Sequence, residues 1–387
     1  MDLRIDGGLV LTGGRLEAVS LNLTDEAGGR ITALGSDAVA MRTLDAAGAL
    51  VLPGIVDIHG DAFERQIMPR PGVSFPVRMA LVDSDRQAVA NGITTVFHGV
   101  TWSWEPGLRN GDNAQLILDG IEQLKPQLCA DTRFHLRHET FNLDAEDQIM
   151  DWLGAGRIDA LAFNDHLTST LTSKRRTEKL APMMARSGLS ETEFMGVVEA
   201  KADRRGEVPA AITRLAAKAA ASRVPLLSHD DTSPEQRQWF RALGCRVAEF
   251  PVTEDTAREA AAAGDDIVLG APNVVRGGSH VGFVKASDMI ARGLCSALAS
   301  DYYYPAPLAA AFRLVADGVA PIETAWPLVS QTPARAVGLH DRGVIAAGRR
   351  ADLLVVDATD LKRPRLEAVI AAGRVVYLRD VAMLRGG

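Results

Sequence analysis

The stretch LPGIVDIHGDAFER, residues 52–65, places a run of aliphatic residues directly before a histidine, a glycine and an aspartate. An unbroken aliphatic run of this kind is typical of a strand that is buried on both faces. Residues i and i+2 of a strand share a face, so His59 and Asp61 are expected to project together from the end of this strand. Gly60 between them allows the backbone to turn or to pass close to another group.

Seven further apolar runs follow, and each precedes a segment with apolar residues at three- and four-residue spacing. Strand–helix alternation repeated eight times over roughly 250 residues predicts an α/β protein with a parallel (β/α)8 TIM-like barrel. An open doubly wound sheet is the alternative, but the eight units and the polar residues that end nearly every strand favour the barrel. The eight runs are residues 51–59, 94–100, 133–139, 159–165, 224–230, 246–251, 266–273 and 296–301.

The two ends of the chain have a different pattern, with short alternating segments separated by Gly-rich turns. We therefore expect residues 1–51 and 343–387 to form one small β-sandwich domain, and residues 52–342 to form the barrel. A long connection at about 166–223 interrupts the barrel pattern. Such a length at the catalytic rim is typical of a lid or a substrate-binding insert, although a solvated charged face would equally explain its basic part at 172–179.

The composition narrows the class of protein. The chain has 387 residues with 47% hydrophobic content, which is ample for a large core, and its net charge of −7 gives no reason to expect nucleic acid or an anionic membrane as a partner. Three cysteines without a C-x-x-C pair favour a reducing cytoplasm. There is no signal-peptide pattern and no apolar run long enough to span a bilayer. Assembly into a homo-oligomer stays open.

Imidazole and carboxylate side chains end five of the predicted strands. Because the C-terminal ends of barrel strands face the active site, these side chains are expected to meet there. Ionised groups buried together are costly unless they pair or bind a metal, and imidazoles with carboxylates suit zinc. A polar network that only holds the barrel rim is the alternative. The residues are His59, Asp61, His135, Arg137, Glu139, Asp165, His166, His229, Asp230, Asp231 and Asp301.

Several phrases resemble the amidohydrolase superfamily. LPGIVDIH at 52–59 is similar to its first barrel strand, and DRGVIAAGRRADLLVVD at 341–357 is similar to its closing signature. The superfamily usually has His-x-His on the first strand, where this chain has His-x-Asp. The chain instead resembles the PhnM-like branch, the α-D-ribose 1-methylphosphonate 5-triphosphate diphosphatases of the carbon–phosphorus lyase pathway. The matching phrases are His-x-Asp on the first strand, SHDD at 228–231 and GAPNVVRGGSH at 270–280. The similarity runs nearly end to end.

The resemblance implies a metal-dependent hydrolase that releases pyrophosphate from a small phosphorylated substrate by cleaving a phosphoanhydride bond. It implies one or two divalent ions, with zinc as the expected metal, and Asp301 as the general base. Glu139 would bridge two ions or serve a single one. The metal ligands that it implies are His59, Asp61, Glu139, His166 and His229.

The segment VVRGGSH at 274–280 is the candidate anion site, because small residues expose backbone N–H groups and Arg276 can donate to a phosphate. An ordinary Gly-Gly turn is the alternative. His98, in a strand-two phrase that departs from the family, is expected to contact substrate. The expected substrate-binding residues are Arg276, Gly277, Gly278, Ser279, His280, Arg70, Arg137, His98 and Tyr302.

Two other functions stay open at this point. An amidohydrolase that cleaves an amide, lactam or amidine C–N bond would use the same metal but would not require the RGGSH segment with its arginine neighbours. A non-catalytic scaffold barrel would be expected to lack ligands, whereas all five ligand positions and Asp301 are present.

Overall fold

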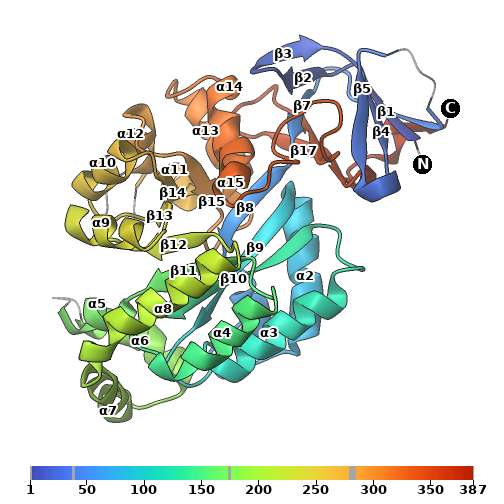
Figure 1. Cartoon of the computed structure of the whole chain (residues 1–387). Coiled ribbons are helices and arrows are strands. Elements are labelled where there is room, and N and C mark those ends of the chain that lie inside the picture. The colour runs from blue at the N-terminus through green and yellow to red at the C-terminus, as the bar shows by residue number, and fades with distance from the viewer. Residues whose placement is uncertain (1, 37–39, 173–175, 279–284, 387) are drawn as a thin grey trace.

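A closed parallel barrel and a smaller pair of sheets make up the computed structural model, which describes residues 2–36, 40–172, 176–278 and 285–386 (Figure 1). The eight barrel strands neighbour one another in chain order, and a parallel bridge between Gly60 and Asp301 joins the first strand to the chain after the last. The predicted (β/α)8 barrel is confirmed. Its strands are β8 (Ile55–Gly60), β9 (Ile93–Trp102), β10 (Asp131–Glu139), β11 (Ala160–Asn164), β12 (Leu226–His229), β13 (Val247–Glu249), β14 (Asp266–Gly270) and β15 (Ala297–Ala299).

Helices cover the outside of the barrel (Figure 1). In α3 (Gly111–Leu124), Ile117, Leu118 and Ile121 are buried at helical spacing, and the Asn110 side chain caps the first turn by accepting from the Asn113 backbone N–H. The other helices around the barrel are α1 (Glu64–Ile67), α2 (Val77–Ala90), α4 (Glu146–Gly154), α9 (Pro234–Ala242), α10 (Glu254–Ala262), α11 (Ala271–Arg276), α12 (Ala286–Ala291), α13 (Ala306–Ala316), α14 (Ile322–Ala325) and α15 (Gln331–Ala336).

Apolar side chains fill the interior of the barrel. Ile58, Phe97 and Leu227 from three different strands are buried together there, and Val337, just after α15, belongs to the same cluster. Filling of this kind makes the barrel a packed core rather than a pore.

The two termini build the smaller domain. A five-stranded sheet has the order β19-β6-β1-β4-β5, and a six-stranded sheet has the order β18-β17-β16-β7-β2-β3. Leu23 of the first sheet and Val51 and Leu353 of the second are buried in one core. The strands are β1 (Asp2–Asp6), β2 (Leu9–Thr12), β3 (Arg15–Ala18), β4 (Leu21–Thr24), β5 (Arg30–Leu34), β6 (Arg42–Asp45), β7 (Leu50–Pro53), β16 (Leu353–Asp357), β17 (Arg365–Ala371), β18 (Arg374–Leu378) and β19 (Leu384–Gly386).

The aliphatic run that opens the barrel divides between the two domains. Residues 50–53 form β7, which pairs with β16 in the six-stranded sheet, and the barrel strand β8 begins only at Ile55. Gly54 separates them, and a Cβ at this position would lie 2.2 Å from the Thr94 hydroxyl. The chain thus passes from the small domain to the barrel at Gly54, where a larger residue would clash with Thr94.

The connection after β11 is helical. It consists of α5 (His166–Thr172), α6 (Arg176–Ser187), α7 (Glu191–Ala202) and α8 (Val208–Ala221), while residues 173–175 of its basic part lie outside the described residues. Phe194 and Val198 of α7 are fully buried in the largest apolar cluster. Arg186 at the end of α6 forms an ion pair with buried Glu105 in the segment after β9. The insert is therefore packed onto the barrel and tied to the strand-two loop.

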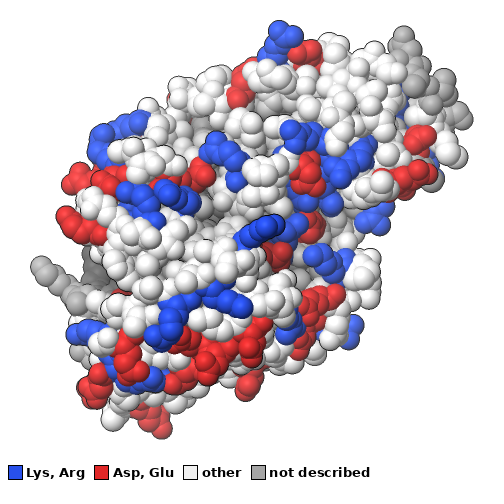
Figure 2. Space-filling model, in the orientation of Figure 1, with Lys and Arg blue, Asp and Glu red and all other residues white. Residues whose placement is uncertain are grey.

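Basic and acidic side chains are interspersed over the face shown in Figure 2. No helix among the described residues combines the length and the apolar character that a membrane crossing requires.

Candidate metal centre

The C-terminal ends of six barrel strands bring imidazoles and carboxylates together. Possible ligand atoms within 4.8 Å of one another occur in three overlapping groups of described residues: His59 with Asp61 and Asp301, His59 with His229 and Glu249, and His166 with His229 and Asp230. Glu139 joins these groups through His166: the Oε1 of Glu139 lies 2.5 Å from the Nδ1 of His166. The structure thus places all five predicted ligands and Asp301 in one connected cluster.

Burial sets the charge of the histidines in this cluster. His59 is 1% exposed, and burial, together with the nearby Arg137 guanidinium, lowers its pKa to about 3. Burial and Arg137 also hold the pKa of His229 well below its usual range. Both imidazoles are therefore neutral at pH 7, which is the form that binds a metal ion.

Glu139 is charged at pH 7, in contrast to His59 and His229. Its burial opposes ionisation, but His166 and, to a smaller extent, Arg137 outweigh that effect and lower the pKa of Glu139 to about 2. The backbone N–H of His166 also donates to Glu139 Oε2 at 3.2 Å. Glu139 is thus an ionised carboxylate in the same cluster as the neutral imidazoles of His59 and His229, a donor set that suits a divalent transition metal.

Asp301 is held against the first barrel strand by its backbone. Its N–H donates to the His59 carbonyl at 3.0 Å, and its own carbonyl accepts from the Asp61 N–H at 2.9 Å. Its φ of 56° lies in the left-handed region, where a non-glycine residue needs such support. Burial, reinforced by the charge of Asp61, raises the pKa of Asp301 to about 8.

Arg137, which is expected to bind substrate, lies inside the cluster of candidate ligands. It is 4% exposed, its Nη1 donates to Asp61 Oδ2 at 3.3 Å, and its Nη2 lies 3.2 Å from His229 Nε2. Room for it comes from Gly99, where a Cβ would lie 3.1 Å from Arg137 Cδ. The Asn164 amide, with its oxygen turned towards Arg137, accepts from it at 3.2 and 3.3 Å.

The cluster fits a divalent metal ion by the chemistry of its donors. These are the neutral imidazole nitrogens of His59 and His229 together with carboxylate oxygens, which are the preferred ligands of such an ion. The residues that would hold an ion are His59, Asp61, Glu139, His166 and His229, with Asp301 beside them.

The predicted substrate-binding residues lie in several places. Arg276 ends α11, is exposed, and donates to the Tyr302 hydroxyl at 3.3 Å, which brings it to the chain beside Asp301. His98 is 1% exposed and its ring packs on Phe63 at 4.8 Å, so it lies under the site as a buried residue.

The remaining members of this set are at the surface or outside the described residues. Gly277 follows α11 with a φ of 76°, a helix-ending conformation that favours glycine, and both Gly277 and Gly278 have open space where a Cβ would be. Arg70 is exposed in a short turn, which an antiparallel bridge between Arg70 and Val73 closes. Ser279 and His280 lie outside the described residues.

The sequence analysis missed Glu249 as a site residue. It ends β13, its side chain is fully buried, and its Oε1 lies 2.9 Å from His59 Nδ1. A carboxylate directly after the sixth apolar run, in the phrase EFP at 249–251, was the available signal. Asp231, in contrast, was expected among the site residues but does not face the cluster. It accepts hydrogen bonds from Ser228 and from the buried Arg237, so it supports the barrel wall.

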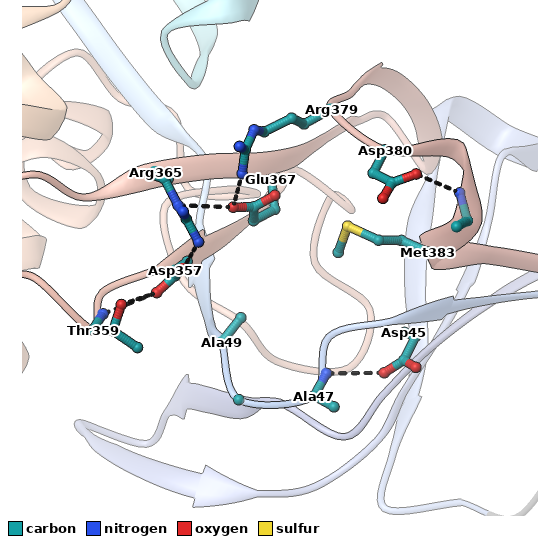
Figure 3. A pocket seen from close by; sticks show the side chains of 12 residues that line it. Asp45, Ala47, Ala49, Asp357, Thr359, Arg365, Glu367, Arg379, Asp380 and Met383 are labelled. Carbon is teal, nitrogen blue, oxygen red and sulfur yellow. Dashed lines mark hydrogen bonds and ion pairs between the residues drawn. The ribbon is translucent and has the colours of Figure 1, made fainter.

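A hollow of about 750 Å³ lies in the small domain and is lined by residues from both ends of the chain (Figure 3). Its arginines are paired with carboxylates of the same domain, Arg365 with Asp357 and Arg379 with Glu367. No imidazole lines this hollow. Its chemistry is that of a surface ion-pair network, and the strand ends of the barrel carry the reactive groups.

Comparisons with known proteins agree with this arrangement. The model of the amidohydrolase family (Amidohydro_3) matches residues 86–377. The chain is 31% identical over 328 residues to an α-D-ribose 1-methylphosphonate 5-triphosphate diphosphatase of Escherichia coli, an alignment that covers 82% of this chain and 85% of that protein. It is 27% identical over 352 residues to an adenine deaminase of Methylobacterium nodulans, covering 87% of this chain and 51% of the deaminase.

Solved structures share the fold at low sequence identity. A dihydropyrimidinase from Brevibacillus agri superimposes with a TM-score of 0.60 at 15% identity, covering 98% of this chain and 95% of that one. A triazine hydrolase variant gives a TM-score of 0.65 at 15% identity, with coverages of 97% and 95%. The solved structures show the fold alone, whereas the family match and the similarity to the diphosphatase establish that the chain belongs to the amidohydrolase family and is a hydrolase.

Proposed function

We propose that the protein is a zinc-dependent diphosphatase of the cytoplasm. It releases pyrophosphate from α-D-ribose 1-methylphosphonate 5-triphosphate, or from a closely related small phosphorylated substrate, in phosphonate catabolism. The observation that supports this most directly is the 31% identity to a diphosphatase of that name, which extends over most of both chains.

The residues of the cluster have distinct roles in this proposal. His59, Asp61, Glu139, His166 and His229 would hold the metal. A bound divalent ion lowers the pKa of a water molecule to about 7 and polarises a phosphoryl oxygen. Asp301, supported by the β8 backbone, would act as the general base when a bound cation offsets the burial and the Asp61 charge that raise its pKa; it would take a proton from the attacking water and pass it to the leaving group.

Positive charge beside the cluster favours an anionic substrate. Arg137 is buried among the candidate ligands, and Arg276 is exposed but reaches the Tyr302 hydroxyl next to Asp301. Arginines at such positions stabilise the negative charge that develops on a leaving pyrophosphate. An uncharged amide would gain nothing from Arg276.

A second candidate activity is hydrolysis of an amidine C–N bond. Its support is the similarity to adenine deaminases, although the chain spans only about half of the length of the deaminase from Methylobacterium nodulans. The reading as a non-catalytic scaffold is not retained, because the family is one of hydrolases and the polar cluster is complete.

The deciding experiment compares substrates on the zinc-loaded protein. We expect pyrophosphate release from ribosyl 5-triphosphates, with no ammonia from adenine and no cleavage of N-acyl or cyclic amides. Ammonia release without pyrophosphate would replace the proposed function by the second candidate. A purified protein with less than about 0.2 zinc per chain after growth with zinc would contradict both activities.

A further inference from the structure

One carboxylate lies against two stacked histidines beneath the cluster. Glu249 is the register partner of His229 in the adjacent strand, and its side chain is fully buried. Its Oε1 lies 2.9 Å from His59 Nδ1, and its Oε2 lies 3.5 Å from His229 Nδ1. The two imidazole rings are nearly parallel, with centroids 5.3 Å apart and an interplanar angle of 13°. The two carboxylate oxygens thus face the same ring nitrogen, Nδ1, of both histidines.

The opposite nitrogen of His229 shows which tautomer this ring has. His229 Nε2 lies 3.2 Å from Nη2 of Arg137. A guanidinium can only donate hydrogen bonds, so Nε2 must present a lone pair to it. A ring that accepts a hydrogen bond at Nε2 carries its proton on Nδ1, and in His229 this is the nitrogen that faces Glu249.

His59 has the same orientation. Its Nδ1 faces Glu249, and its Nε2 lies 3.7 Å from the point where a Cβ on Gly99 would be. The Cδ of Arg137 lies 3.1 Å from that same point. The Nε2 atoms of His59 and His229 therefore both face the side of the cluster that holds Arg137.

A hydrophobic wall keeps other partners away from the Nδ1 side. The Phe250 ring packs edge-on against His59 at 4.9 Å and against His229 at 5.2 Å. Its φ of 52° is an uncommon conformation for a bulky residue, and it turns the ring towards the two histidines. Phe250 thus covers this side of the rings, and among the described residues Glu249 is the acceptor that faces the Nδ1–H group of each ring.

We propose that Glu249 is a positioning residue that accepts the Nδ1–H of His59, faces the Nδ1–H of His229, and so orients the Nε2 atoms of both rings towards a metal ion. The proposal rests on the metal-dependent function proposed above. A carboxylate suits this role because both of its oxygens accept, whereas an amide has one accepting and one donating end. A shared carboxylate of this kind fixes the tautomer and orientation of ligating imidazoles.

The test is the zinc affinity of Glu249→Gln, measured by competition with a chelator. In this variant one histidine would meet an amide N–H and would have to move its proton to Nε2. We expect zinc to bind about 10–100-fold more weakly than to the wild type. The matched control is Glu105→Gln, a buried glutamate that pairs with Arg186 and contacts no histidine, and it should keep the wild-type affinity. A Glu249→Gln protein that binds zinc as tightly as the wild type overturns the proposal.

A second measurement does not depend on that variant folding. Nitrogen-15 NMR of the histidine side chains in the zinc-loaded wild type should show two rings protonated at Nδ1, one lost in His59→Gln and the other in His229→Gln. Protonation of either ring at Nε2 overturns the proposal. If the wild type binds zinc but releases no pyrophosphate, the proposed substrate fails while the role of Glu249 stands. A wild type that binds no zinc defeats both.

Discussion

At the scale of single residues, Asp301 has the most constrained position in the site. Its backbone is held between the His59 carbonyl and the Asp61 N–H, and its φ is positive. Ser300 before it donates to buried Asp57 through both its N–H and its hydroxyl, at 2.9 and 2.5 Å. The last barrel strand is therefore fastened to the first at the point where the proposed general base is needed.

Asp301→Asn should remove the proton acceptor without weakening the fold. We expect the rate of pyrophosphate release to fall by about 10²–10⁴-fold. The melting temperature should not decrease, because the wild-type carboxyl is buried near Asp61, which raises its pKa and makes its charged form unfavourable. The control is Asp317→Asn, which changes an exposed aspartate paired with Arg313. An Asp301→Asn protein with the wild-type rate would remove Asp301 from the mechanism.

Arg276→Ala tests the anion site. Arg276 is exposed at the end of a short helix, so its loss should disturb folding little. A charge-assisted hydrogen bond to a phosphate is worth about 1.5–3 kcal/mol, so KM for a triphosphate substrate should rise about 10–100-fold. Arg292→Ala, an exposed arginine paired with Glu254, should leave KM unchanged. Steady-state kinetics with both variants decides this, and an unaltered KM for Arg276→Ala would count against the assignment.

At the scale of elements, a buried ion-pair network ties the start of β10 to the segment that returns to the small domain. Arg342 donates to Asp131 Oδ2 at 2.6 Å and to the Thr95 hydroxyl at 2.8 Å. Arg133 donates to the same carboxylate at 3.0 Å. Burial opposes ionisation of Asp131, but the two arginines outweigh it and lower its pKa to about 2.

This network makes stability depend on pH in a definite direction. The pKa of Asp131 is lower in the folded state, so its stabilising contribution is complete above its unfolded pKa, near 4, and is lost as the pH falls through about 2. Asp131→Asn should therefore lower the free energy of unfolding by about 2–3 kcal/mol at pH 7. Urea unfolding should show that the difference in free energy of unfolding between the variant and the wild type is smaller at pH 3 than at pH 7. A difference that stays constant over this range would contradict the linkage.

At the scale of the whole molecule, a continuous apolar core joins the two domains. Leu52, Leu354 and Val369 of the six-stranded sheet are buried in one cluster with the barrel residues Ile93 and Phe312. The indole N–H of buried Trp326 donates to the Pro53 carbonyl at 2.9 Å, where the chain passes from one domain to the other. Both ends of the chain are thus needed to cover one side of the barrel.

Because the candidate ligands come from strands spread around the barrel, metal binding should stabilise the protein as a whole. Free zinc at 100 times its dissociation constant would add about 2.7 kcal/mol to the free energy of unfolding. Calorimetry should therefore show a higher Tm with zinc and a lower one after chelation. The same comparison on a protein with His59→Gln and His229→Gln should show a much smaller shift. An identical Tm with and without zinc in the wild type would argue against the site.

The amino-acid sequence alone determined the barrel and the residues that meet at its mouth. Eight apolar runs with helical segments between them predict strands of a closed parallel sheet, and the C-terminal ends of such strands necessarily converge. His59, Asp61 and Asp301 could be named for this reason, since each directly follows or ends a recognisable run. The resemblance to amidohydrolases added roles to positions that the pattern had already singled out.

Only the tertiary structure decided how these side chains relate to one another. It placed Arg137 inside the cluster, because Gly99 on the neighbouring strand leaves space there. It also set Glu249 against His59 from the first barrel strand, as well as against His229 on the adjacent strand. Local periodicity reports which face of a strand a residue occupies, but contacts across a barrel depend on register and side-chain packing between separate strands. These are properties of the folded chain as a whole, and no short stretch of sequence encodes them.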